Sequence, residues 1–363
     1  MTEAPAKRAP LIDRLLRATV ERSGSDLHLI AGNPPRFRVH GDLEILEPSK
    51  LDAEELSKSL AAITPVVAAA AYQKYDQADF AYDIDDVARF RVNIFRHIGG
   101  SGAVMRSIPS KARSIDDLGL PAVIRSLCEQ RQGMILVTGK TGSGKSTTLA
   151  AMIDEINARR KGHIVTIEDP IEFLHSRRGC LISQREVGTH TPSFAEALHS
   201  ALREDPDVVL VGELRDLETM STAITAAEMG ILVLGTLHTN GAAATVDRVV
   251  HAFPPDKQAH IRTMLSTSLR GVISQQLCKR KDGRGRVPAL EILVNTPAVS
   301  NLLRQGKLDQ LETAMQSGAA VGMRTMDTAL QEHLDRRMIS GREAYDKADN
   351  KERFKKAAEM SHV

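Results

Sequence analysis

The chain has 363 residues, 42% of them hydrophobic, which is enough for two domains with buried cores. Its 48 basic and 46 acidic residues nearly cancel, and only 3% of residues are aromatic, so composition gives no support for nucleic-acid binding. The longest apolar runs are about ten residues, too short to span a membrane, and residues 1–10 lack the apolar segment of a secretory signal. We expect a globular cytoplasmic protein without membrane insertion.

The first part of the chain combines short helices and strands. Periodic apolar residues predict a helix over residues 12–23, and residues 51–75 are helical with an interruption at Pro65. The alternating segments that predict strands cover residues 26–29, 35–39, 80–84 and 89–95. These elements predict a small α+β domain over residues 1–107, followed by a linker over residues 108–117.

Beyond this linker the pattern changes to apolar strands separated by helical segments. The predicted strands cover residues 135–138, 164–167, 208–211 and 232–235. Such alternation is typical of a mostly parallel sheet, so residues 118–296 predict an α/β core. Residues 297–363 are rich in methionine, glutamine and charge and predict a helical C-terminal region.

A glycine-rich loop directly follows the first of these strands. From Gly139 to Ser146 it fits the pattern G-x-x-x-x-G-K-[ST] without a gap. Its glycines let backbone N–H groups point at phosphate oxygens, and the helix that begins near Lys145 adds the positive end of its dipole. Lys145 is expected on the β- and γ-phosphates and the Ser146 hydroxyl on Mg²⁺. The predicted nucleotide-binding residues are Gly139, Thr141, Gly142, Ser143, Gly144, Lys145, Ser146 and Thr147.

Acidic residues follow two further strands, and hydrolysis needs such groups to orient a water molecule. Glu213 comes after strand 208–211 in a Walker B pattern, with Gly212 in place of the usual metal-binding aspartate. We predict that Glu213 polarises the attacking water, and that Glu213 and Glu168 hold Mg²⁺, directly or through water. Glu213 could alternatively be a surface carboxylate paired with Arg215. Asp169, which follows Glu168 after strand 164–167, could alternatively cap the turn there.

Several motifs occur in the order known from one superfamily. Residues 166–173 form TIEDPIEF, residues 201–207 ALREDPD, residues 235–239 GTLHT and residues 322–327 GMRTMD. In these segments the chain resembles the secretion ATPases of the GspE/PulE type, and within them the PilT/PilU-like group of type IV pilus retraction motors. The three cysteines form no C-x-x-C pair, which argues against the pilus-extension and type II secretion relatives, since these usually carry a zinc-binding insertion.

This resemblance implies a fold and a function. It implies a PAS-like N-terminal domain, a RecA-like P-loop core and a homohexameric ring that hydrolyses ATP to power pilus retraction and twitching motility. It also implies that Glu168 and Asp169 form an acidic box, that Glu213 is the Walker B glutamate, and that His238 senses the γ-phosphate. From the residue alone, His238 would fit a core histidine equally well.

The resemblance further implies that arginines of the N-terminal domain neutralise charge on the nucleotide. Arg91 and Arg106 occupy the matching positions, and a guanidinium suits this role because it is always charged and its fork matches phosphate oxygens. Arg89 is the alternative to Arg91. Without the resemblance, each would be interpreted as an exposed strand arginine.

The chain departs from the family at two places. Ile231 replaces the first of two histidines in the family's histidine box, and residues 298–305 form AVSNLLRQ where retraction motors usually have AIRNLIRE.

The resemblance also implies partners, namely an inner-membrane platform protein, for which the charged surface near residues 302–311 is a candidate contact, and a second retraction ATPase. The implied location is the cytoplasmic side of the inner membrane at the pilus base. The alternative functions are an accessory or regulatory ATP-binding subunit with weak turnover, and a different secretion-type translocase.

Overall fold

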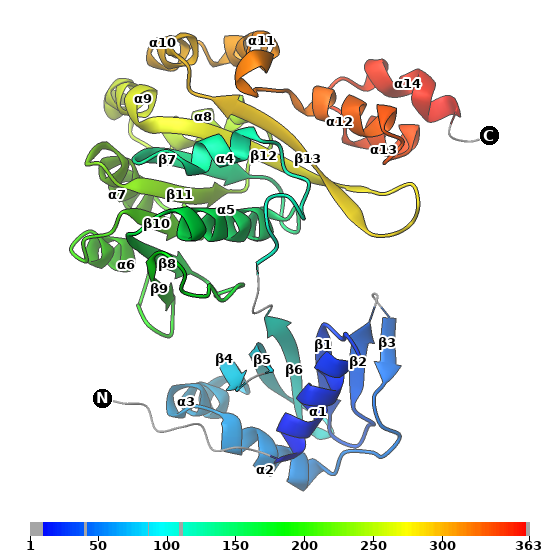
Figure 1. The fold of residues 1–363 in the computed structure, drawn as a ribbon. Coiled ribbons are helices and arrows are strands. Elements are labelled where there is room, and N and C mark those ends of the chain that lie inside the picture. The colour runs from blue at the N-terminus through cyan, green and yellow to red at the C-terminus, as the bar shows by residue number, and fades with distance from the viewer. Residues whose placement is uncertain (1–9, 40–41, 86, 109–111, 361–363) are drawn as a thin grey trace. The chain divides into compact units, whose positions relative to one another are not determined.

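The computed structural model describes residues 10–39, 42–85, 87–108 and 112–360. The chain divides into two compact units, Met1–Ser110 and Lys111–Val363, and each has a sheet of its own (Figure 1). Residues 1–9, in which the sequence shows no secretory signal, and residues 109–111 of the expected linker lie outside the described residues. The two units are described separately below.

The first unit is built on a six-stranded antiparallel sheet with the order β3-β2-β1-β6-β5-β4. Its strands are β1 (Asp26–Ile30), β2 (Arg36–Val39), β3 (Asp42–Ile45), β4 (Gln77–Ile84), β5 (Ala88–His97) and β6 (Gly100–Ile108). Its helices are α1 (Pro10–Glu21), α2 (Ala53–Ile63) and α3 (Val66–Tyr75). Alternation along β5 buries Phe90, Val92 and Ile94 in the core shared with these helices, so Arg89 and Arg91 lie on the opposite face of the sheet.

The second unit contains a seven-stranded sheet with the order β13-β12-β7-β11-β10-β8-β9. Its strands are β7 (Gly133–Thr138), β8 (His163–Glu168), β9 (Leu181–Glu186), β10 (Val208–Val211), β11 (Leu232–Leu237), β12 (Leu269–Lys279) and β13 (Arg286–Val294). From β12 to β9 neighbouring strands are parallel, and β13 runs antiparallel to β12. This strand order is that of a RecA-like core.

Helices cover both faces of this sheet (Figure 1). Met134 and Leu136 of β7 belong to one buried cluster, and Ile135 and Val137 belong to the other. The first cluster includes residues of α6 (Phe194–Ala201), α7 (Leu217–Glu228), α8 (Ala242–His251) and α9 (Pro255–Ser268). The second includes residues of α4 (Val123–Cys128) and α5 (Lys145–Arg159). Burial on both faces explains why the central strands are continuously apolar.

The C-terminal region is helical and packs on the sheet at two places. Its helices are α10 (Pro297–Gln305), α11 (Leu311–Ser317), α12 (Met326–Asp335), α13 (Gly341–Lys347) and α14 (Lys351–Glu359), with the short 3₁₀ turns η1 (Leu308–Gln310) and η2 (Ala319–Val321). Val299 and Leu311 join the first core cluster. Phe354 of α14 is fully buried in a separate cluster with Cys278 of β12 and Leu330 of α12.

The fold class expected from the sequence is confirmed. A small α+β unit of the expected PAS-like kind precedes an α/β core with a RecA-like sheet and a helical C-terminal region. The four core strands expected from the apolar runs are present, and β3, β6, β9, β12 and β13 add to the strand ranges named from the sequence. Across the described ranges, no helix combines the length and apolar character that a membrane span requires.

The three cysteines, Cys128, Cys180 and Cys278, are buried and make no disulfide. Burial raises the pKa of Cys128 and of Cys278 to about 12, and burial also raises the pKa of Cys180. Because the thiolate is the reactive form, we expect the folded protein to react slowly with a thiol-specific disulfide reagent at about pH 8. All three thiols should react within minutes after unfolding in guanidinium. Rapid modification of the folded protein would contradict this packing.

Candidate active site

Four parallel strands bring the predicted site residues to one edge of the second sheet. Register pairs Gly133 of β7 with Leu232 of β11, and Leu232 with Val208 of β10. Strand β8 continues this register on the other side of β10. The carboxyl ends of the four strands are therefore level, and this edge carries the glycine-rich loop after β7, His238 after β11, Glu213 after β10 and Glu168 at the end of β8.

The glycine-rich loop has the backbone geometry of a phosphate cradle. Gly139, Gly142 and Gly144 have φ values of 140°, 77° and 90°, which side chains larger than hydrogen rarely tolerate. Helix α5 begins at Lys145 without a side-chain cap, so the N–H groups of its first turn remain available for an anion. The Ser143 hydroxyl is buried and has no hydrogen-bond partner among the described residues. The loop therefore fits the phosphate groups of a nucleotide.

Lys145 lies folded back onto this loop. Its Nζ donates hydrogen bonds to the carbonyl oxygens of Gly139 at 2.9 Å and Lys140 at 3.2 Å. Burial lowers the pKa of Lys145, whereas the negative charges of Glu213 and Glu172 act in the opposite direction. The ammonium group is thus held beside the loop, and the negative charge of Glu213 favours its charged form.

Glu213 lies between two partners that occupy both of its carboxylate oxygens. Arg215 Nε donates to Oε2 at 2.6 Å, and His238 Nε2 lies 3.3 Å from Oε1. Arg215 also lies 3.8 Å from the Asp169 carboxylate. The pairing with Arg215, considered from the sequence as an alternative, is therefore present, and it occurs together with the contact to His238. His238 itself is exposed rather than part of the core.

Glu168 is hydrogen-bonded by donors from its own strand, from the loop that follows it and from β9. Its carboxylate accepts hydrogen bonds from Thr166 Oγ1 at 2.6 Å, from the backbone N–H of Glu172 at 3.4 Å and from Gln184 Nε2 at 3.4 Å. Burial raises the pKa of Glu168 in spite of these donors. The structure thus places Glu168 at the expected edge, with partners of its own.

The oxygen donors at this edge suit Mg²⁺. Ser146, Glu213 and Glu168 supply one hydroxyl and two carboxylates, and Mg²⁺ commonly binds through one or two carboxylates, substrate phosphates and water. The described residues contain no group of three or more histidine, cysteine, aspartate or glutamate side chains placed to hold a metal ion by themselves. These residues fit a Mg²⁺ ion that enters with the nucleotide phosphates.

Arg91 and Arg106 lie opposite each other on neighbouring strands of the first unit. They are paired in the antiparallel register of β5 and β6. Arg106 Nε donates to Asp26 Oδ1 at 2.7 Å, and Arg91 Nε lies 3.8 Å from Asp79 Oδ1. The two arginine side chains are 49% and 69% exposed, whereas Arg89, the alternative to Arg91, is 16% exposed. Both predicted arginines therefore present charge to solvent from one sheet face.

Asp26 holds Arg106 in place. Its side chain is 6% exposed, and although burial opposes ionisation, hydrogen bonds from Ser25 and Arg106 keep the pKa of Asp26 below its ordinary value. Only the Nε of Arg106 is used in this contact. Among the described residues no further partner holds the outer part of its guanidinium fork, which can therefore meet another anion.

Sequence reasoning missed two glutamines at this edge. Gln184 of β9 donates to Glu168, and Gln275 of β12 hydrogen-bonds both to the glycine-rich loop and to α5. A signal was present for the second residue, because Gln275 and Gln276 are consecutive polar residues within an apolar strand.

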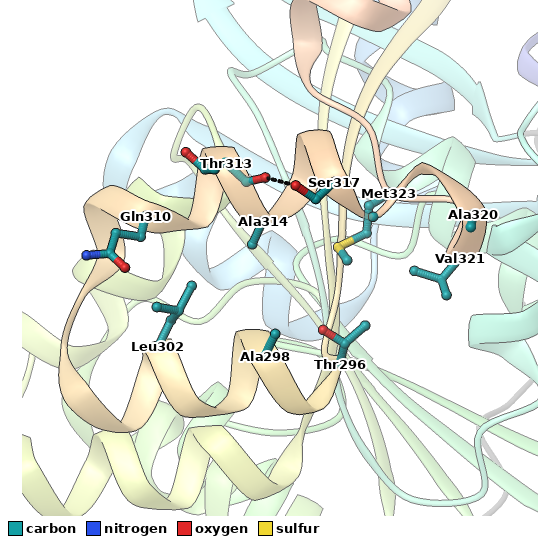
Figure 2. A pocket seen from close by; sticks show the side chains of 11 residues that line it. Thr296, Ala298, Leu302, Gln310, Thr313, Ala314, Ser317, Ala320, Val321 and Met323 are labelled. Carbon is teal, nitrogen blue, oxygen red and sulfur yellow. Dashed lines mark hydrogen bonds between the residues drawn. The ribbon is translucent and has the colours of Figure 1, made fainter.

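A separate cavity of about 620 Å³ lies between α10 and α11 in the C-terminal region (Figure 2). Figure 2 shows that Ala298 and Leu302 of α10 face Ala314 of α11 across it. Its lining is uncharged and includes Thr296, Ala298, Leu302, Gln310, Thr313, Ala314, Ser317, Gly318, Ala320, Val321 and Met323. The cavity does not have the cationic groups that a nucleotide phosphate requires.

Several known proteins are similar to this chain over nearly its whole length. Residues 2–359 match the family described as "Type II/IV secretion system protein". The chain is 48% identical over 343 residues to the "Type IV pilus retractation ATPase PilT" of Pseudomonas aeruginosa, covering 94% of this chain and 99% of that protein. It is 37% identical over 338 residues to the "Type IV pilus ATPase PilU" of the same organism, covering 93% and 88%. A solved structure described as "Crystal Structure of the Pilus Retraction Motor PilT and Bound ADP" has a TM-score of 0.88 at 41% identity and covers 96% of this chain and 99% of that one. The chain belongs to the Type II/IV secretion system protein family.

Proposed function

We propose that this protein is an ATPase that acts as a homohexameric motor and powers type IV pilus retraction, and thereby twitching motility. The observation that carries the proposal is the placement of Glu213, in contact with His238, at the same sheet edge as the phosphate cradle. The similarity to the PilT retraction ATPase along nearly the whole chain supports the pilus as its site of action. Identity to PilT is higher than identity to PilU, which favours the main retraction motor over an accessory one.

The cradle binds the phosphates of ATP. The N–H groups of the glycine-rich loop and of the first turn of α5 donate to phosphate oxygens. The Lys145 ammonium group leaves the carbonyl oxygens of Gly139 and Lys140 and neutralises the negative charge of the phosphates. Gly139, Thr141, Gly142, Ser143, Gly144 and Thr147 complete the loop. Ser146, together with Glu213 and Glu168 directly or through water, would hold Mg²⁺, and the ion would supply positive charge to offset the negative charge that develops during phosphoryl transfer.

Glu213 activates the water molecule that attacks the γ-phosphorus. A bond forms between this water oxygen and the γ-phosphorus, and the bond to the bridging oxygen of ADP breaks. Glu213 accepts the water proton as general base. Arg215 and His238 hold its two oxygens in place, so its orientation is set before the nucleotide arrives. His238 also contacts the γ-phosphate and so responds to its loss.

Arg91 and Arg106 supply positive charge to the γ-phosphate. Arginines directly opposite each other in a sheet repel, and the carboxylates of Asp26 and Asp79 offset part of this repulsion. A polyphosphate relieves that repulsion, and the anchoring of Arg106 by Asp26 reduces the entropy lost on binding. These features favour the pair over Arg89, which is packed and paired with Asp83.

The proposed motor delivers its work at the membrane. Its partners are an inner-membrane platform protein of the pilus and a second retraction ATPase, and its place is the cytoplasmic side of the inner membrane at the pilus base. The similarity to PilT and PilU supports this assignment. The segment near residues 302–311 is the proposed platform contact, and the neighbouring cavity gives that surface an apolar recess (Figure 2).

Replacement of Glu213 by alanine tests the proposed hydrolysis. We expect kcat for ATP to fall at least about 100-fold because the general base is lost. The matched control is Glu218→Ala, which removes an exposed carboxylate at the start of α7. Steady-state phosphate release is measured for all three proteins, with light scattering to verify that each remains a hexamer. If the wild-type protein binds ATP but hydrolyses it no faster than the Glu213→Ala variant does, the protein is instead a regulatory subunit.

Separate replacements of Arg91 and Arg106 by lysine test the proposed charge-neutralising pair. Lysine keeps the charge but lacks the fork, so we expect kcat to fall about 100-fold or more while the Kd for ATP changes little. Lysine at position 106 also leaves a cation beside buried Asp26, which limits loss of stability. The control is Arg96→Lys, because Arg96 lies on β5 with Arg91 and pairs with Asp76. Wild-type turnover by both variants would exclude the pair as catalytic arginines.

A further inference from the structure

Gln275 of β12 is a buried side chain that joins the glycine-rich loop to the helix following it. Gln275 is 2% exposed. Its Nε2 donates to the Ser143 carbonyl oxygen at 2.7 Å, and its Oε1 accepts from Thr148 Oγ1 of α5 at 2.7 Å. Both ends of one amide are therefore used, one at the loop and one at the helix.

The sheet register explains why Gln275 reaches this position. Strand β12 runs parallel to β7, and Ser274 is paired with Thr138, the last residue of β7. Gln275 is consequently level with Gly139, where β7 gives way to the loop. A Cβ atom at Gly139 would lie 2.3 Å from the Gln275 carbonyl oxygen, and one at Gly144 would lie 2.7 Å from Gln275 Nε2. The glycines at both ends of the loop thus admit close contact with this residue.

The bond to Ser143 affects the part of the loop that would meet phosphate. In a trans peptide the C=O and the following N–H point in opposite directions. The Ser143 carbonyl points toward β12 because it accepts from Gln275. The N–H of Gly144, in the same peptide plane, is therefore directed away from β12.

We propose that Gln275 is a positioning residue for the phosphate loop, which fixes the Ser143–Gly144 peptide so that its N–H group faces the nucleotide phosphates. Gln275 makes no contact with the nucleotide itself. An amide is required because the residue must donate to a carbonyl and accept from a hydroxyl at once. A carboxylate could accept from Thr148 but would repel both the Ser143 carbonyl oxygen and the phosphates. This inference rests on the proposed ATP site.

Two substitutions separate the two ends of the amide. Gln275→Glu keeps the size of the side chain and the contact with Thr148, and it removes the donor to Ser143. Thr148→Val keeps the shape of the helix residue and removes the donor to Gln275. The control is Gln276→Ala, because Gln276 lies next in the strand on its other face and donates to the Lys347 carbonyl oxygen.

The experiment measures the Kd for MgATP and MgADP by calorimetry and steady-state ATP hydrolysis on the full chain. We expect Gln275→Glu to weaken both Kd values at least about tenfold, and Thr148→Val to weaken them about threefold. KM for ATP should rise by the same factor while kcat stays within about threefold of wild type, because the loop holds phosphate equally in the ground and transition states. Gln276→Ala should retain both constants.

Thermal unfolding without nucleotide separates positioning from simple loss of stability. If Gln275→Glu cannot be purified in folded form, Thr148→Val decides. Unchanged Kd values in these variants, a fall in kcat with KM unchanged, or an equal effect of Gln276→Ala would overturn the inference and leave the proposed function intact. Failure of the unchanged protein to bind MgATP would remove the proposed function and this inference with it.

Discussion

The candidate active site depends on the parallel register of neighbouring strands in the second sheet. Strands β7, β11, β10 and β8 are apolar on both faces and lie between two layers of helices, so a shift of one residue would misplace closely packed side chains in both layers. That constraint keeps their carboxyl ends level. Residues far apart in sequence then meet, as Glu213 and His238 do at 3.3 Å. Loops at this edge can carry polar groups because the strands beneath them are fixed by burial.

Buried polar groups extend from this edge to the C-terminal helices. Glu291 of β13 is 6% exposed and accepts from the N–H of Ala242 at the start of α8, at 2.6 Å, and from that of Met326 at the start of α12, at 3.3 Å. Burial raises the pKa of Glu291, and the two backbone donors oppose that change. The positive ends of two helices thus share one carboxylate. Since α8 follows the loop that carries His238, that loop and α12 are joined through a single side chain.

Short sequence patterns predicted the parts of the site whose residues are close together in the sequence. The glycine-rich loop and Glu213 each follow an apolar strand, and a few residues are enough to recognise them. The pairing of Arg91 with Arg106, and the contact of Gln275 with Ser143 across 132 positions, follow from strand register, which no short pattern encodes. Strand β3 was missed although its four residues, Asp42–Ile45, alternate between polar and apolar; all four are exposed, so this alternation places no side chain in the core.

The two departures from the family pattern lie away from the groups proposed for hydrolysis. Ile231 comes before β11, whose first residue pairs with Gly133 at the start of β7, so it is at the opposite end of the strand from His238. Its side chain packs against the core, where an apolar residue is stable. The altered segment 298–305 forms most of α10, and Ala298 and Leu302 line the uncharged cavity (Figure 2). A change at that surface alters what α10 can contact and leaves Lys145 and Glu213 in place. We therefore expect this chain to differ from other retraction motors in the partner that it binds rather than in its ATP turnover.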